Sequence, residues 1–303
     1  MQYIGRFAPS PSGPLHFGSL IAATASYLCA KSVQGQWLLR IEDVDKFRIK
    51  KNSIDSIINT LESYGYQWDS EILYQSQRTE AYQYALDSLK TLTYPCTCTR
   101  KFLQQKTPVG TYGYIYTGFC REQISNPNAT QFSIRLRTNS KTIYFNDALQ
   151  APYHQNIEIE VGDFILKRSD KMFSYQLAVV VDDEYQKITE VVRGSDLLDN
   201  TPRQLYLQQC LGYHHPTYLH FPIAITEDGK KLSKQNHSPE VAKHHKRQTI
   251  LQVLNFLGQQ APPLDYFSNL EDLWDWAIKN WNRDKIPAQM TLSKDYPHYH
   301  DKF

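Results

Sequence analysis

Two apolar runs near the start of the chain have the length and composition of strands, and each is followed by a segment with helical spacing. The runs are residues 3–8 and 36–41. Apolar residues then recur every three or four positions from residue 19 onward and again over 54–61. The second helical pattern stops near Gly65. Strand, helix, strand, helix in this order predicts an α/β fold with a parallel sheet.

The alternation returns in the second half of the chain, after a long interruption. Residues 178–181 (Ala-Val-Val-Val) and 188–192 are predicted to be buried strands. A helix is expected after Asn200, with Thr201 as its N-terminal cap. Towards the C-terminus, the apolar stripe over residues 270–281 is typical of a helix that packs on a core.

Composition and charge exclude few classes of protein. Of the 303 residues 41% are hydrophobic and 21% charged, and the net charge is +2. Nucleic-acid binding must therefore be argued from local charge. Lys and His crowd residues 230–247, a composition that also fits a solvated loop. Without a long apolar run or a signal peptide, we expect a cytoplasmic protein with no membrane contact.

The segment that joins the first strand to the first helix is a candidate nucleotide site. It runs from Pro9 to Ser19 and lies at the carboxyl edge of the predicted sheet, where open α/β folds bind ligands. Gly13 and Gly18 allow the backbone to approach a phosphate closely. His16 can donate a hydrogen bond to a phosphate oxygen, and the helix N-terminus offers free N–H groups to an anion.

A second candidate lies about two hundred residues further on, in the loop 229–235 (Gly-Lys-Lys-Leu-Ser-Lys-Gln). A glycine-led loop with three lysines can close over a triphosphate, where charge develops during displacement at the α-phosphorus. Either segment alone fits an ordinary turn or a basic loop. Together, and in this order, they indicate an ATP site.

At these two segments the chain resembles class I aminoacyl-tRNA synthetases. Residues 16–19 (His-Phe-Gly-Ser) are similar to their His-Ile-Gly-His signature, and residues 231–235 to their Lys-Met-Ser-Lys-Ser loop, with Ser19 and Gln235 as departures. The contexts 6–13 and 40–43 are similar to the glutamyl-tRNA synthetase branch.

The resemblance implies residue roles and a domain organisation. It implies that His16 and Lys234 are catalytic, and that Gly18, Lys231 and Ser233 bind ATP with them, Mg²⁺ accompanying the nucleotide. It also implies a Rossmann-like parallel sheet. We therefore expect a catalytic domain over residues 1–240, interrupted by an insertion at about 66–165, and a helical part over 241–303.

Charged residues at the ends of the predicted strands suit the recognition of glutamate. Arg6 ends the first predicted strand, Glu42 ends the second, and Arg193 follows the strand that ends at residue 192. All three are therefore expected at one edge of the sheet. Guanidinium groups bind the side-chain carboxylate, and a carboxylate binds the α-ammonium group. Surface ion pairs of small value are the other interpretation.

The resemblance to the glutamyl branch extends this pocket. It implies that Ala8, Ser10 and Tyr175 line the glutamate site together with the three charged residues. Where ordinary glutamyl enzymes carry an amino-acid-binding Asn, this chain has Val179. Weaker glutamate binding than in those enzymes is therefore expected.

Three cysteines and a tyrosine form a candidate metal site. Cys96 and Cys98 are followed by Tyr116 and Cys120, with Gly118 permitting a tight turn between the last two. Three sulfurs with one oxygen donor suit tetrahedral Zn²⁺, although a redox or buried pair of cysteines is also compatible with the spacing. We expect a structural zinc.

The metal-site spacing resembles one subgroup, the glutamyl-Q tRNA(Asp) synthetases, as do the chain length, Val179 and the loop variant at 231–236. That resemblance implies transfer of glutamate to the queuosine base of aspartate tRNA by a monomer that lacks an anticodon-binding domain. Two other functions stay open. One is a short glutamyl-tRNA synthetase that charges the 3′ end of tRNA(Glu), and the other is an inactive paralogue that binds RNA or glutamate.

Overall fold

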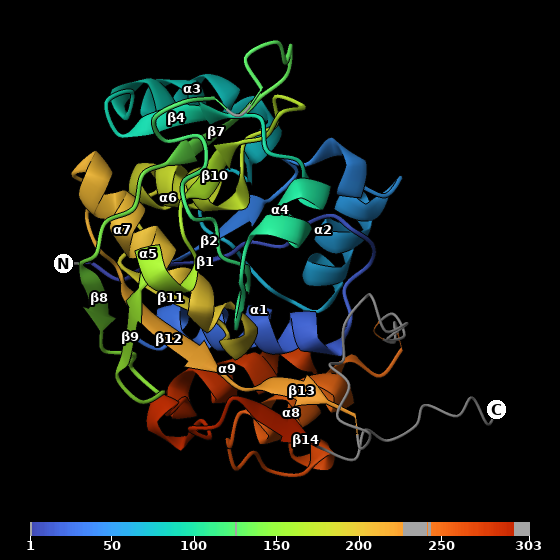
Figure 1. Cartoon of the computed structure of the whole chain (residues 1–303). Helices are drawn as coiled ribbons and strands as arrows, with labels where there is room; N and C mark the ends of the chain where they lie inside the picture. The colour runs from blue at the N-terminus through green and yellow to red at the C-terminus, as the bar shows by residue number, and fades with distance from the viewer. Residues whose placement is uncertain (1, 125, 227–240, 242–243, 294–303) are drawn as a thin grey trace.

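The computed structural model describes residues 2–124, 126–226, 241 and 244–293, and a parallel sheet lies at its centre (Figure 1). One set of strands pairs in the order β1-β2-β3 and a second pairs β11 with β12. The sets meet where the Ile4 N–H donates to Thr189 Oγ1 at 2.9 Å. The strands are β1 (Ile4–Phe7), β2 (Gln36–Ile41), β3 (Leu73–Tyr74), β11 (Glu190–Gly194) and β12 (Thr217–Phe221). The predicted parallel α/β sheet is confirmed.

Helices bury both faces of this sheet (Figure 1). Trp37 and Leu39 of β2 belong to one apolar core, whereas Leu38 between them belongs to the other. Val191 and Val192 of β11 divide in the same way. Burial on two faces makes each strand a continuous apolar run. The first core contains residues of α1 (Phe17–Lys31), α2 (Ser53–Ser63), α8 (Lys246–Phe256) and α9 (Leu270–Asn280), and the second residues of α3 (Thr79–Ser88), α6 (Tyr175–Tyr185) and α7 (Thr201–Leu211).

The strand expected at 178–181 is wrong, because these residues lie inside helix α6. The Ser174 side chain starts the helix by accepting a hydrogen bond from the Leu177 N–H at 3.3 Å. Every residue from 176 to 183 is buried, so this part of the helix has no solvent-exposed face. A helix buried on all sides has the same apolar run as a buried strand, and periodicity does not separate them.

Between β3 and α6 the chain turns to antiparallel pairing. Three strands pair in the order β10-β7-β4, and two further pairs are antiparallel. These elements occupy most of the span 66–165 that is expected to interrupt the sheet. They are β4 (Thr93–Cys96), α4 (Arg100–Lys106), β5 (Val109–Gly110), β6 (Gly113–Tyr114), β7 (Ser133–Leu136), β8 (Thr142–Phe145), β9 (Tyr153–Asn156), α5 (Ile157–Glu160) and β10 (Phe164–Lys167).

The described C-terminal residues pack on α1 (Figure 1). Leu273, Trp274 and Ala277 of α9 are buried, which confirms that the stripe over 270–281 is core packing. Trp274 Nε1 donates to the Tyr64 carbonyl at 2.8 Å. The region also contains strand β14 (Thr291–Ser293), which runs parallel to β13 (Ile223–Ile225). Among the described residues, no helix has the length and apolar character needed to cross a membrane.

Candidate active site and metal centre

A cavity of about 500 Å³ opens at the carboxyl edge of the central sheet. Residues from the ends of β1, β2, β11 and β12 and from the start of α1 form its walls. Parallel strands present their carboxyl ends at one edge, which is why residues so distant in sequence meet there. The cavity is lined by all the residues expected to bind glutamate and by two expected to bind ATP: Arg6, Ala8, Ser10, Glu42, Tyr175, Arg193, His16 and Gly18.

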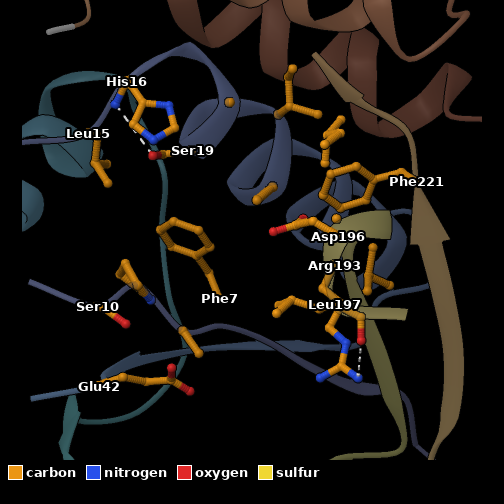
Figure 2. Close-up of a pocket in the computed structure, with 18 of the residues that line it drawn as sticks. Phe7, Ser10, Leu15, His16, Ser19, Glu42, Arg193, Asp196, Leu197 and Phe221 are labelled. Atoms are coloured by element: carbon orange, nitrogen blue, oxygen red, sulfur yellow. Dashed lines mark hydrogen bonds between the residues drawn. The ribbon is translucent and has the colours of Figure 1, made fainter. Parts of the chain in front are cut away.

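The N-terminus of α1 forms one end of the cavity. His16 precedes the helix with an extended backbone (φ −119°, ψ 175°), and its N–H donates to the Ser19 hydroxyl at 3.4 Å (Figure 2). Ser19, which departs from the family signature, therefore helps to close the first turn. Gly13 has φ +145°, a conformation that favours glycine. A helix N-terminus with an adjacent imidazole is suited to binding an anion.

A carboxylate in α6 holds two guanidinium groups beside the cavity. Asp183 accepts from Arg6 Nε and Nη2 at 3.1 and 3.3 Å, and from Arg40 Nη1 at 2.7 Å. Burial raises the pKa of the Asp183 carboxyl, but Arg6 and Arg40 outweigh it and hold that pKa below its usual value. Asp183 is therefore charged at neutral pH and balances part of the buried positive charge.

Glu42 follows β2 and lines the cavity. Its side chain is 8% exposed, and Arg40 Nη2 lies 3.6 Å from its Oε1. Burial raises the pKa of Glu42 to about 7, although Arg40 and Arg6 act in the opposite direction. Burial disfavours the charged carboxylate, and a cationic ligand next to Glu42 would stabilise it.

Arg193 of β11 is 5% exposed, and its hydrogen-bond partners in the described part of the chain are uncharged groups. Nη1 donates to the Tyr175 hydroxyl at 3.5 Å, and Nη2 donates to Thr201 Oγ1 at 2.8 Å and to the Leu197 carbonyl at 3.3 Å. The expected role of Thr201 as a helix cap is wrong, because Asn200 is the N-cap residue of α7. The Thr201 hydroxyl orients Arg193 instead.

Sequence reasoning missed two residues behind Arg193. Its Nε donates to His220 Nε2 at 3.0 Å, and His220 Nδ1 lies 2.6 Å from Asp147 Oδ2. Both side chains have no exposed surface. His220 lies within an apolar strand and Asp147 in a loop 73 residues away, so no local pattern relates them.

Figure 2 separates the cavity into two ends. His16 and Ser19 lie at one end, and Glu42 and Arg193 lie across from each other at the opposite end. Val179, one turn after Tyr175 in α6, is buried in the second core and does not line the cavity. The expected ATP-binding residues Lys231, Ser233 and Lys234 lie outside the residues that the structure describes, as does most of the basic stretch 230–247.

Cys96, Cys98, Tyr116 and Cys120 come together as expected from their spacing. The three sulfur atoms lie within 4.8 Å of one another. The Tyr116 hydroxyl is 3.3 Å from Cys96 Sγ and 3.7 Å from Cys98 Sγ. Cys98 and Cys120 Sγ are 3.6 Å apart, too far for a disulfide of about 2.05 Å. Zinc with bonds of about 2.3 Å places its sulfur ligands about 3.8 Å apart, so the donors fit this metal.

A buried arginine lies against this cluster. Arg135 is 5% exposed, its Nε donates to Cys96 Sγ at 3.2 Å, and its guanidinium carbon lies 3.7 Å from the centre of the Tyr116 ring. Its Nη1 donates to the backbone carbonyl of Asp163. A buried guanidinium needs negative charge nearby, which the cysteine thiolates of a metal site would supply. Gly118 has φ +86°, as its place in the turn before Cys120 requires.

The sequence matches one family model over most of its length. The family is described as tRNA synthetases class I (E and Q), catalytic domain, and the match covers residues 4–261.

Two relatives are similar over almost the whole chain. A protein of Pseudomonas entomophila named glutamyl-Q tRNA(Asp) synthetase is 46% identical over 293 residues, which cover 96% of this chain and 97% of that protein. A protein of Dechloromonas aromatica with the same name is 45% identical over 294 residues, with coverages of 96% and 97%.

Solved structures show the same fold. A glutamate-tRNA synthetase from Elizabethkingia anophelis aligns with TM-score 0.79 at 24% identity, over 97% of this chain and 68% of that one. A glutamate tRNA ligase from Elizabethkingia meningosepticum, in complex with its amino acid, also aligns with TM-score 0.79, at 25% identity over 97% of this chain and 67% of that one.

Proposed function

The chain belongs to the class I tRNA synthetases of the E and Q type, and on that premise we propose that it is a ligase that activates L-glutamate with ATP and transfers it to the queuosine base of tRNA(Asp). The names of its relatives support this reaction. The observation that carries it is the cavity at the sheet edge, where three guanidinium groups and two carboxylates line a space beside the N-terminus of α1.

Charged residues on opposite sides of the cavity suit the side-chain carboxylate and the α-ammonium group of glutamate. We assign the side-chain carboxylate to Arg193, with Arg6 near it, because Arg193 has only uncharged partners in the described structure and can give its full charge to a ligand. Glu42, on the opposite side, takes the α-ammonium group. Tyr175 stands beside Arg193 and closes the pocket between them.

This orientation leaves the α-carboxylate directed towards the nucleotide end of the cavity. An oxygen of that carboxylate attacks the α-phosphorus of ATP, a new phosphorus–oxygen bond forms, and pyrophosphate leaves with the bonding electrons. His16 and the first N–H groups of α1 bind the phosphate oxygens. Mg²⁺ that accompanies ATP supplies further neutralisation of phosphate charge.

In the second step a hydroxyl of the acceptor attacks the carbonyl carbon of glutamyl-adenylate. The ester bond forms, AMP leaves, and the hydroxyl proton passes to solvent. A neighbouring cavity of about 340 Å³ shares Glu42, Arg48 and Tyr175 with the first, and we place the acceptor nucleoside there. Phe47, beside Arg48, is 79% exposed and offers a ring on which an unstacked base can lie.

We further propose that Cys96, Cys98, Tyr116 and Cys120 bind one structural Zn²⁺, since the donor set and its spacing fit that ion. None of these four residues lines the cavity, and no step of the reaction is assigned to them. The enzyme acts on tRNA as a cytoplasmic monomer in this proposal.

Two assays test the function. Glutamate-dependent exchange of pyrophosphate into ATP is expected without any RNA, and its absence would contradict glutamate activation. Labelled glutamate is then offered to tRNA(Asp) with and without queuosine, and to tRNA(Glu). Label should appear only on the queuosine-containing tRNA. Label on the 3′ end of tRNA(Glu) would instead identify a short glutamyl-tRNA synthetase.

A further inference from the structure

Behind the cavity, a buried chain of hydrogen bonds connects Arg193 to a carboxylate that does not touch the cavity. Arg193 Nε donates to His220 Nε2 at 3.0 Å, and His220 Nδ1 lies 2.6 Å from Asp147 Oδ2. All three side chains are nearly or fully buried. Neither His220 nor Asp147 lines the cavity, so neither can contact a ligand in it.

The partners of His220 define its protonation state. Burial lowers the pKa of His220 to about 4, despite the opposing effect of Asp147, so the ring is neutral at physiological pH and carries one proton. Asp147 is an acceptor, and its pKa is held below the usual value by the His220 contact against the effect of burial. The proton is therefore on Nδ1. Nε2 is left with its lone pair, which the Arg193 N–H requires.

A third contact supports this tautomer. Thr201 Oγ1 lies 3.3 Å from His220 Nε2 and accepts from Arg193 Nη2 at 2.8 Å. Because the Thr201 oxygen accepts from Arg193, its own proton is available to the imidazole. Nε2 thus faces two donors, and a proton on that nitrogen would be opposed by both.

Asp147 is itself fixed by the backbone. Its other oxygen, Oδ1, accepts from the N–H groups of Leu149, Gln150 and His220 at 3.0, 2.9 and 3.1 Å. The Ala148 N–H also donates to the Tyr218 carbonyl at 2.8 Å. The loop after β8 is therefore attached to β12, and Asp147 Oδ2 is directed at His220.

From this geometry we propose that Asp147 and His220 are positioning residues for glutamate recognition: Asp147 sets the His220 tautomer, and neutral His220 holds the Arg193 guanidinium in the orientation that binds the side-chain carboxylate. The proposal rests on the proposed function, since it assigns that carboxylate to Arg193. The negative charge of Asp147 is then close to Arg193 without a direct ion pair, because His220 lies between them. The N–H groups of Arg193 that face the cavity therefore remain available to the substrate.

Asp147→Asn tests the tautomer with little change in shape. The amide oxygen can keep the three backbone contacts of Oδ1, while the amide NH₂ replaces Oδ2 and donates to His220 Nδ1. The ring proton must then move to Nε2, where it meets the Arg193 N–H. We expect the KM for glutamate in ATP–pyrophosphate exchange to rise roughly ten- to hundredfold, with the KM for ATP and the Tm nearly unchanged.

A matched pair at the histidine isolates the acceptor. His220→Gln can place a carbonyl oxygen near the position of Nε2, whereas His220→Asn reaches only the position of Nδ1. Glutamate binding by the Gln variant should stay closer to that of the wild type. Equal losses in the two variants, or an Asp147→Asn enzyme with an unchanged KM for glutamate, would overturn the proposal. A parallel rise in both KM values with a large fall in Tm would also overturn it, since that result describes a purely structural role.

A measurement without substrate separates this proposal from the proposed function. The ¹⁵N chemical shifts of the wild-type His220 ring should show a protonated Nδ1 and an unprotonated Nε2, and the reverse pattern would refute the tautomer. If wild-type exchange does not require glutamate, the proposed function fails. If it does, but Asp147→Asn behaves as the wild type, only the role of Asp147 and His220 fails.

Discussion

Arg6 and Asp183 form a two-point ion pair, with Nε to Oδ1 at 3.1 Å and Nη2 to Oδ2 at 3.3 Å, and the pair connects the first strand to helix α6. The same carboxylate accepts from Arg40 at 2.7 Å. One buried anion therefore compensates two buried cations, and the wall of the cavity depends on it.

Asp183→Asn should be strongly destabilising, because two buried guanidinium groups lose their counter-charge. We expect the free energy of unfolding to fall by roughly 3–5 kcal/mol, measured by urea denaturation. Glu184→Gln is the matched control, since its ion pair with Lys187 is on the surface and is worth about 1 kcal/mol or less. Similar losses in the two variants would contradict the assigned role of Asp183.

Glutamate affinity should depend on pH near neutrality. Burial raises the pKa of Glu42 to about 7, and only the carboxylate form attracts the α-ammonium group. Affinity should therefore increase between pH 6 and pH 8, as titration calorimetry with glutamate would show. An affinity that is constant over this range would argue against contact between Glu42 and the ammonium group.

Glu42→Gln should stabilise the fold at alkaline pH while abolishing glutamate-dependent exchange. The pKa of Glu42 is higher in the folded state than the ordinary 4.5, so the folded state binds this proton more tightly. Stability from this group is present below pH 4.5 and is lost as pH rises through about 7. At pH 8 the variant should gain roughly 3 kcal/mol in the free energy of unfolding. A less stable variant at pH 8 would refute the burial argument.

Zinc retention should depend on Arg135. Elemental analysis should find one zinc per chain. A folded protein that is purified without zinc would contradict the proposed zinc site. Arg135→Met removes the donor to Cys96 Sγ, and we expect zinc affinity to fall about 10- to 100-fold in competition with a chelator. Arg203→Met is the control, because Arg203 contacts Asp199 and Asn200 and should leave the affinity nearly unchanged.

Phe47→Ala should separate the two steps of the reaction. Phe47 is 79% exposed beside Arg48, which lines both cavities. We expect transfer of glutamate to the queuosine-containing tRNA to fall roughly tenfold or more through lost base stacking, with RNA-independent exchange unchanged. Tyr84→Ala, another exposed aromatic, provides the control. A reduced rate of exchange would place Phe47 in glutamate activation instead.

The sequence predicts the strands of the central sheet and the residues of the cavity better than it predicts helix α6. Strand β2 has the predicted bounds. The apolar run from Trp37 to Ile41 is short and has polar residues on both sides, which favours a strand over a helix. The valines of α6 are equally apolar, but Ser174 starts a helix there, and burial on every side removes the solvent-exposed face that would have revealed it.

The residues that line the cavity and are proposed to bind glutamate are also predictable, because most lie near the carboxyl ends of strands and the others belong to segments similar to the family. Their supporting residues are not. Asp147 and His220 are related only by the pairing of the loop after β8 with β12, and that pairing is a tertiary contact. Thr201 illustrates the same limit, since its neighbourhood suggests a helix cap and only the fold shows Arg193 within reach of its hydroxyl.

The junction between β1 and β11 also affects how the protein is made. Ile4 and Thr189 are 185 positions apart, so during synthesis the first strand leaves the ribosome long before its neighbour exists. Until that segment arrives, the edge of β1 opposite β2 lacks its contacts with Thr189 and β11, and an uncovered strand edge invites association with other chains. The antiparallel region is completed in the meantime. The cavity can therefore mature only late in translation, and nascent chains that end before β11 should be the ones most dependent on chaperones.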